Sequence, residues 1–285
     1  MRAAWLSRSR RQPVPISDLQ ANLLLLIASK RDPESFIAGG IPINRTGPRF
    51  SADIDIFQDR EARVAEAALT DAKVLTDAGY EVHWLRQQPA TYSATIRSGS
   101  DETKLEGLAD SDYRFFPAIK DDQFGYVLHM VDLAVNKFMA AASRREPRDI
   151  VDLVTVHERV LPLGAIVWAA VNIAPGYTPE GLIGEVRRNA RYPADELRQI
   201  AAEPPIDPGA TMRKLRTALD EAEQFVAVMP SDKAGMLFLQ GGQPVQPDPA
   251  NLETYSTHLP QRRGHWPSTP EITAAMLDYL QKPRP

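Results

Sequence analysis

The most informative part of the chain is residues 36–57, which read FIAGGIPINRTGPRFSADIDIF. Within it, residues 51–57 (SADIDIF) place two isoleucines on one side of an alternating run and Asp53 and Asp55 on the other. Strict alternation is typical of a strand that is buried on one face only. The segment therefore predicts a half-buried strand whose polar face carries two carboxylates, about 6–7 Å apart along the backbone.

The two carboxylates indicate a site for a divalent cation. Like charges on one strand face repel each other, and no basic residue lies between Asp53 and Asp55 to compensate. Mg²⁺ prefers carboxylate oxygens and removes this conflict, with Mn²⁺ as an alternative ion. Gly39 and Gly40 precede the strand, and a turn without side chains lets backbone amides approach phosphate oxygens closely. Ser51 can donate its hydroxyl to the same anion.

An isolated Asp-x-Asp pair is also typical of a solvated edge strand that carries no site. The combined pattern Gly-Gly-x₁₀-Ser-x-Asp-x-Asp favours a site for phosphate and metal instead. A site that holds two metal ions needs a third carboxylate. We expect this ligand to be Glu106, which lies in the middle of a predicted strand at residues 103–109. Asp110, at the end of the same strand, is the competing candidate.

A second group of charged residues lies in residues 132–152, DLAVNKFMAAASRREPRDIVD. Lys137 falls within an apolar helical pattern, and Asp149 follows a run of arginines. A lysine in such a helix can simply extend its ammonium to solvent, and an arginine–aspartate junction can be only a helix cap with an ion pair. In the functional interpretation, Lys137 is a point charge for a triphosphate and Asp149 orients it.

Helical and strand patterns divide the chain into two parts. In the first part we expect helices at residues 16–30 and 60–78, strands at 36–38, 51–57, 80–85, 91–96 and 103–109, and a hairpin turn at Gly99-Ser100. In the second part we expect helices at residues 132–143, 148–161, 165–172, 179–190, 194–202 and 208–229, a lone strand at 235–239, a surface loop at 241–267 and a short helix at 271–280. This order predicts an α/β (α+β) fold with a small mixed-sheet core at residues 12–125 and a mainly helical domain at residues 126–285 that completes the site.

Composition limits the class of protein. The 285 residues are 43% hydrophobic and 25% charged, which is typical of a soluble globular protein. No apolar run approaches the roughly 20 residues that span a bilayer, so we expect no membrane segment. The arginine-rich start lacks a following apolar region, and we expect no secretory signal there. The absence of cysteine excludes disulfides and fits a cytoplasmic location.

Charge and histidine content narrow the function further. A net charge of −4 argues against a protein coated by nucleic acid, although a local basic patch stays compatible with it. The five histidines include no two at ligand spacing on one predicted helix, so a histidine-built zinc site is not expected.

Three ordered motifs resemble a known family. Residues 36–57, LEGLADSDYRFFP (105–117) and LHMVDLAVNKFMAAASRREPRDIVDL (128–153) are similar to the AbiEii/AbiGii-type nucleotidyltransferase toxin family. That family belongs to the DNA polymerase β-like nucleotidyltransferase superfamily. The resemblance extends from about residue 16 to residue 153. It implies a site made of Gly39, Gly40, Ser51, Asp53, Asp55, Lys137 and Asp149.

The resemblance also implies a function. We expect an enzyme that uses Mg²⁺ and transfers a nucleotide from ATP, GTP or CTP to an acceptor, with release of pyrophosphate. The expected acceptor is RNA, such as a tRNA end, and the expected role is the toxin of a toxin–antitoxin pair, with a cognate antitoxin as partner. A small molecule or a protein side chain is an alternative acceptor. A nucleotide-binding module without turnover is the more distant alternative.

Overall fold

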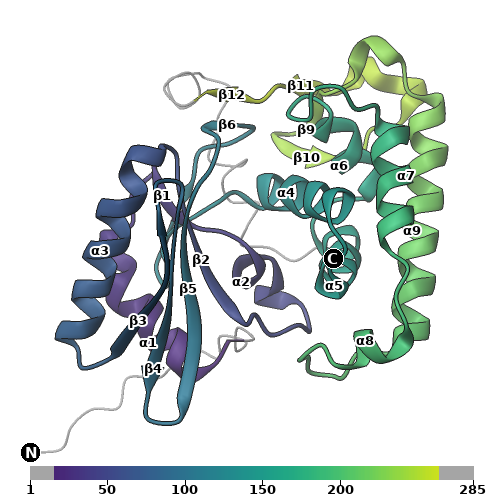
Figure 1. The fold of residues 1–285 in the computed structure, drawn as a ribbon. Coiled ribbons are helices and arrows are strands. Elements are labelled where there is room, and N and C mark those ends of the chain that lie inside the picture. The colour runs from purple at the N-terminus through teal and green to yellow at the C-terminus, as the bar shows by residue number, and fades with distance from the viewer. Residues whose placement is uncertain (1–15, 263–285) are drawn as a thin grey trace, which may run out of the picture.

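The computed structural model describes residues 16–262, and a seven-stranded mixed sheet forms the centre of its first half (Figure 1). Its strands are β1 (Ser35–Ile37), β2 (Asp53–Gln58), β3 (Glu81–Gln88), β4 (Thr91–Ser98), β5 (Asp101–Ala109), β7 (Ile119–Asp121) and β8 (Gly125–Val127). Their order in the sheet is β3-β4-β5-β2-β1-β8-β7. The central strand β2 runs parallel to β5 and antiparallel to β1.

The strand predicted from the alternating segment is confirmed as β2. Ile54 and Ile56 are buried on one face, while Asp53 and Asp55 are only partly buried on the other. The predicted hairpin turn is confirmed between β4 and β5, where Ser98 pairs with Asp101 and Gly99 has a φ of +61°. Alternation and turn chemistry therefore located these strands correctly, because both depend on neighbouring residues alone.

Helices α1 (Asp18–Ile27) and α3 (Glu61–Asp77) cover one face of the sheet (Figure 1). A capping box begins α1, since the Ser17 side chain accepts from the Gln20 backbone amide and Gln20 Oε1 accepts from the Ser17 amide. The short helix η1 (Ala28–Lys30) continues α1. Both helices confirm the amphipathic patterns predicted for residues 16–30 and 60–78.

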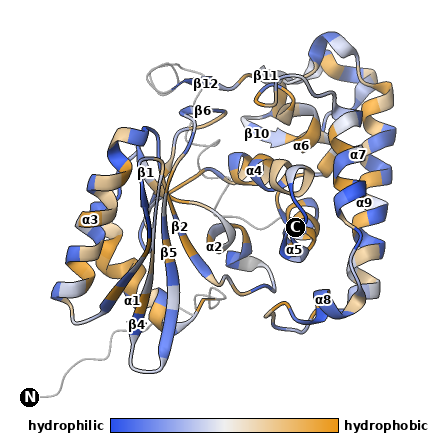
Figure 2. Cartoon of the chain, in the orientation of Figure 1, coloured by the Kyte–Doolittle hydropathy of each residue, from blue (hydrophilic) through white to orange (hydrophobic). Residues whose placement is uncertain are grey.

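The helical part lies on the other face of the sheet (Figure 1). Helix α6 is buried along its whole length and appears apolar in Figure 2. The first turn of α7 has Thr178 as its N-cap and Pro179 at its first position. None of the helices between residues 16 and 262 is long and apolar enough to cross a membrane. The helices on this side are α2 (Gly40–Ile43), α4 (Met130–Ser143), α5 (Pro147–Arg159), α6 (Leu163–Ala170), α7 (Pro179–Asn189), α8 (Ala194–Arg198) and α9 (Pro208–Val228), with η2 (Asn44–Thr46) after α2.

The end of the described chain differs from the prediction. The strand expected to stand alone at residues 235–239 is β9 (Leu237–Gln240), which pairs with β10 (Gln243–Val245) and β11 (Ser256–His258). The surface loop expected at residues 241–267 is therefore wrong in part, and it also contains η4 (Pro249–Thr254) and β12 (Gln261–Arg262), which pairs with β6 (Tyr113–Arg114). Strands of two or three residues have too few positions to show alternation.

The remaining differences concern the middle and the last part of the chain. β7 and β8 were not predicted, for the same reason of length, and α8 is shorter than the helix expected at residues 194–202. The division into domains at residues 12–125 and 126–285 stays a prediction, and its boundary lies within β8, which joins the sheet through a parallel pair between Ile37 and Val127. The helix expected at residues 271–280 lies outside the described residues.

Candidate active site

The parallel pairing of β2 with β5 brings the acidic residues together. Asp55 lies opposite Glu106, and Asp53 lies opposite Lys104. Paired residues of neighbouring strands point to the same face of a sheet, so all four side chains lie on the face that carries the helical part. Asp110 lies beyond the end of β5, where its pKa is raised mainly by burial. The strand register therefore places Glu106, and not Asp110, beside the aspartate pair.

Gly39 packs directly against Asp55. It has a φ of +67° and precedes α2, and a Cβ at this position would lie 1.8 Å from Asp55 Oδ2. Only glycine fits a left-handed backbone with a carboxylate in that place. The first glycine of the predicted turn is thus required both by conformation and by the closeness of the acidic pair.

Gly40 and Ser51 adjoin the same turn. A Cβ on Gly40 would lie 2.3 Å from Arg49 Nη2 and 3.0 Å from Ser51 Oγ. The Ser51 hydroxyl donates to the backbone carbonyl of Asp53 over 3.0 Å. The glycine pair, the serine and the aspartates therefore form one continuous group, as the sequence pattern predicts.

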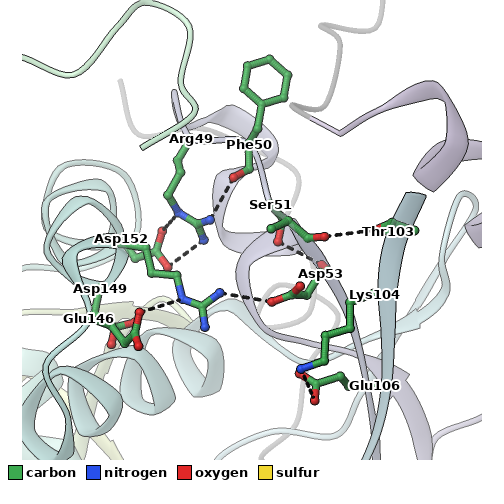
Figure 3. Close-up of polar contacts among 12 residues, drawn as sticks. Arg49, Phe50, Ser51, Asp53, Thr103, Lys104, Glu106, Glu146, Asp149 and Asp152 are labelled. Atoms are coloured by element: carbon green, nitrogen blue, oxygen red, sulfur yellow. Dashed lines mark hydrogen bonds and ion pairs between the residues drawn. The ribbon is translucent and has the colours of Figure 1, made fainter. Parts of the chain in front are cut away.

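Basic side chains hold two of the three carboxylates. Asp53 Oδ2 lies 3.2 Å from Arg148 Nη1, and Glu106 Oε1 lies 2.7 Å from Lys104 Nζ (Figure 3). Within residues 16–262, no group of three or more His, Cys, Asp or Glu side chains is gathered closely enough to hold a metal ion. Asp53 and Glu106 instead turn toward separate cations.

Asp55 is the least compensated member of the group. Burial raises the pKa of its carboxyl, and the neighbouring charges of Asp53 and Glu106 raise it further, while Lys137 and Arg148 act in the opposite direction. A carboxylate oxygen that is desolvated and repelled by two other carboxylates is suited to a hard divalent cation. Asp53, Asp55 and Glu106 therefore offer the carboxylate oxygens that Mg²⁺ and Mn²⁺ prefer, although in this structure Arg148 and Lys104 hold two of the three side chains apart.

Lys137 contacts Asp152, so the prediction that Asp149 orients it is wrong. Lys137 Nζ lies 2.7 Å from Asp152 Oδ2. Asp149 instead accepts two hydrogen bonds from Arg144, at 2.8 and 3.0 Å. Asp149 and Asp152 are one helical turn apart on α5, and only the packing of α5 on α4 decides which of them meets the lysine.

Asp152 is the centre of a buried ionic cluster that sequence reasoning missed. It accepts a bidentate pair of hydrogen bonds from Arg49, at 2.8 and 3.0 Å (Figure 3). It also accepts one hydrogen bond from Asn44, at 2.8 Å. Burial alone raises the pKa of Asp152, but the charges and hydrogen bonds of Lys137 and Arg49 hold it far below its ordinary value. One carboxylate thus faces two cations, and the cluster carries a net positive charge.

The position of Arg49 explains how this cluster reaches the glycine turn. Its side chain is almost fully buried and occupies the space that a Cβ on Gly40 would need. The only sequence signal was an arginine two residues before Ser51, which by itself has no specificity. The charges that could bind an anion, Arg49 and Lys137, therefore lie beside the acidic group that could bind a cation.

Comparison with solved structures shows that this chain shares its fold with MenT4. The solved structure of MenT4, a nucleotidyltransferase toxin from Mycobacterium tuberculosis H37Rv, superposes with a TM-score of 0.51 at 15% sequence identity and covers 75% of this chain and 84% of MenT4. Cid1, described with RNA terminal uridylyl transferase activity, covers 85% of this chain and 72% of its own, but its TM-score of 0.28 and identity of 11% are too low to bear on the fold.

No family model and no curated protein matches the chain. The predicted mixed sheet followed by a helical part is thus a fold that the chain shares with MenT4, and membership of the AbiEii/AbiGii-type family stays a prediction.

Proposed function

We propose that this chain is a Mg²⁺-dependent nucleotidyltransferase whose active site is the group around Asp53, Asp55 and Glu106. The observation that carries the proposal is the contact between Gly39 and Asp55, where a Cβ would lie 1.8 Å from the carboxylate. This contact puts a side-chain-free turn, suited to phosphate, beside a carboxylate suited to the metal. The nucleotidyltransferase fold supports the same function.

In this proposal Asp53 and Asp55 hold the metal, and Glu106 is a third ligand or the base that takes the acceptor proton. When bound, Mg²⁺ neutralises the charge that develops on the phosphates. The acceptor hydroxyl attacks the α-phosphorus, a new phosphoester forms, and the bond to pyrophosphate breaks. The protein contributes mainly by position and by electrostatics.

The buried cluster supplies positive charge for the triphosphate. Lys137 and Arg49 share a single carboxylate, Asp152, as ion-pair partner, so these three side chains together carry a formal charge of +1 beside the site. We assign Lys137 to the triphosphate as a point charge and Asp152 to its orientation. Asp149 holds Arg144 at the start of α5 and so has a supporting role in this proposal.

The acceptor in this proposal is RNA, such as a tRNA end. Arg144, Arg145 and Arg148 lie next to the site, but Arg144 is bound to the buried Asp149 and Arg148 to Asp53. Arg145 donates two hydrogen bonds to the Arg191 carbonyl and lies 3.7 Å from Glu196 Oε1. It stacks over Tyr192, with 4.8 Å from its guanidinium carbon to the ring centroid, but its side chain is 54% exposed and holds no buried carboxylate. Arg145 is therefore the arginine of this group most available to an RNA phosphate. A small molecule or a protein side chain is the alternative acceptor.

Incubation of the purified chain with each labelled nucleoside triphosphate, Mg²⁺ and total RNA tests the function. We expect one triphosphate to label RNA, and Asp55→Asn to reduce labelling by at least about a hundredfold. An Asp55→Asn variant that labels RNA within about tenfold of the wild type would exclude the proposed metal site.

The acceptor is tested by salt and by charge reversal. Phosphate contacts release counterions, so RNA labelling should fall steeply as salt rises. Arg145→Glu should weaken RNA labelling and leave triphosphate binding unchanged. Arg144 is unsuitable for this reversal, because a glutamate there would face the buried Asp149. Labelling that responds to neither salt nor Arg145→Glu would favour the small acceptor.

A further inference from the structure

Two kinds of ion pair surround the candidate active site, and they differ in how firmly they are held. Arg49 binds Asp152 through two hydrogen bonds, and the two side chains are 4% and 0% exposed. Arg148 contacts Asp53 through one nitrogen at 3.2 Å, and its side chain is 38% exposed. A monodentate, half-exposed arginine pair is much weaker than a buried bidentate one.

Lys104 resembles Arg148 in this respect. It contacts Glu106 at 2.7 Å, and its side chain is also 38% exposed. Arg148 is further marked by its Nε, which is buried without a hydrogen-bond partner and lies 3.9 Å from Glu146 Oε2. Arg148 and Lys104, which contact Asp53 and Glu106, are thus more easily released from the site than the buried Arg49.

We infer that Arg148 and Lys104 compete with the divalent cation for Asp53 and Glu106, and that Arg148, once displaced, binds the triphosphate. The inference rests on the proposed function. A guanidinium that leaves Asp53 needs another anion, and a triphosphate that arrives with the metal provides one. The competition therefore makes the site bind the free metal weakly and the metal–triphosphate complex well.

Binding of Mn²⁺ alone to the full chain, measured by calorimetry or by electron paramagnetic resonance, tests this competition without any turnover. Arg148→Gln and Lys104→Gln should each tighten Mn²⁺ binding by about two- to fivefold, the change expected when one half-exposed ion pair is removed. Arg145→Gln is the matched control, because it removes an equal charge from the same helix junction without touching a carboxylate of the metal site. We expect it to leave Mn²⁺ affinity unchanged.

The second readout separates competition from a merely structural role. Arg148→Gln should bind Mn²⁺ more tightly and yet transfer nucleotide more slowly, by about tenfold or more, because the triphosphate loses a cation. Arg148→Gln that binds Mn²⁺ no better than the wild type, while Asp55→Asn abolishes binding, would overturn the inference and leave the proposed function intact. Wild-type protein that binds Mn²⁺ no better than Asp55→Asn would overturn both.

Discussion

Gly39 and Asp55 constrain each other at the scale of single residues. The glycine has a φ of +67°, and the carboxylate of Asp55 fills the space where any other residue would carry its Cβ. Gly79 offers a comparison, since it has a φ of +91° but has nothing within 4 Å of its Cβ position. Both positions have a positive φ that favours glycine. Of the two, only Gly39 would bring an added Cβ into contact with the Asp55 carboxylate.

Gly39→Ala should therefore lower both the free energy of unfolding and the rate of nucleotide transfer more than Gly79→Ala does. A non-glycine residue in a left-handed conformation costs about 1–3 kcal/mol. Gly39→Ala must in addition displace the Asp55 carboxylate, so we expect transfer to fall by at least about a hundredfold. Urea unfolding and the RNA-labelling assay measure the two effects. Equal loss of activity in both variants would show that strain, and not the contact with Asp55, is responsible.

The ionised carboxylate of Asp55 should also lower the free energy of unfolding when no metal is bound. Burial and two neighbouring carboxylates raise its pKa, so the folded protein binds the proton more tightly than the unfolded chain does. The charged form is thus unfavourable in the folded state at every pH above the ordinary aspartate value of 3.8. Stability is regained as the pH falls through the raised pKa.

Asp55→Asn should accordingly melt at a higher temperature than the wild type at neutral pH without metal, and the difference should shrink as the pH falls toward the ordinary aspartate value of 3.8. Added Mg²⁺ should raise the melting temperature of the wild type and leave the asparagine variant unchanged. Thermal denaturation followed by circular dichroism provides the measurement. A variant less stable than the wild type at neutral pH would contradict the electrostatic account of Asp55.

At the scale of elements, Asp152 joins three segments. It lies on α5, accepts from Lys137 on α4, and accepts from Asn44 and Arg49 in the segment between α2 and β2. The sheet and the helices are thus connected through one buried carboxylate. Because this carboxylate faces two cations, its removal deprives both of these buried side chains of their ion-pair partner.

Asp152→Asn should lower the free energy of unfolding by about 3–5 kcal/mol, as expected when one partner of a buried ion cluster is removed. Asp77→Asn is the control, since Asp77 forms an exposed pair with Lys73 one turn away on α3 and should change stability by no more than about 0.5 kcal/mol. Chemical denaturation of both variants gives the comparison. Similar small losses in both would mean that the cluster contributes little to holding α4 and α5 against the sheet.

At the scale of the whole molecule, the candidate site lies where the sheet meets the helical part. β2 and β5 provide the carboxylates, and α4 and α5 provide Lys137 and Asp152. A toxic role in a bacterial host, with a cognate antitoxin as partner, stays a prediction from the sequence resemblance.

Expression of the wild-type chain in a bacterial host should arrest growth, and Asp55→Asn should relieve the arrest, because the arrest depends on nucleotide transfer. Growth curves after induction, with protein levels matched by immunoblot, measure this effect. Normal growth with an enzyme that is active in vitro would remove the toxic role and leave the chemistry unchanged. Arrest by the Asp55→Asn variant as well would show that toxicity has another origin.

The local features of this protein could be predicted from its sequence. Alternation located β2 and put Asp53 and Asp55 on its polar face, and amphipathic spacing located α1, α3 and α9. These features depend on residues a few positions apart, so each segment carries its own signal. The short strands β7, β8 and β10 carry too few residues for any period to appear.

The pairing of distant residues was decided by the tertiary structure alone. The parallel register of β2 and β5 puts Glu106 beside Asp55, and the packing of α5 on α4 gives Lys137 to Asp152 instead of Asp149. Arg49 became part of the site only because its loop passes over Gly40. The spacing of residues along one strand or helix determines which side chains share a face. The partner that this face meets depends on how separate elements pack, which no local pattern contains.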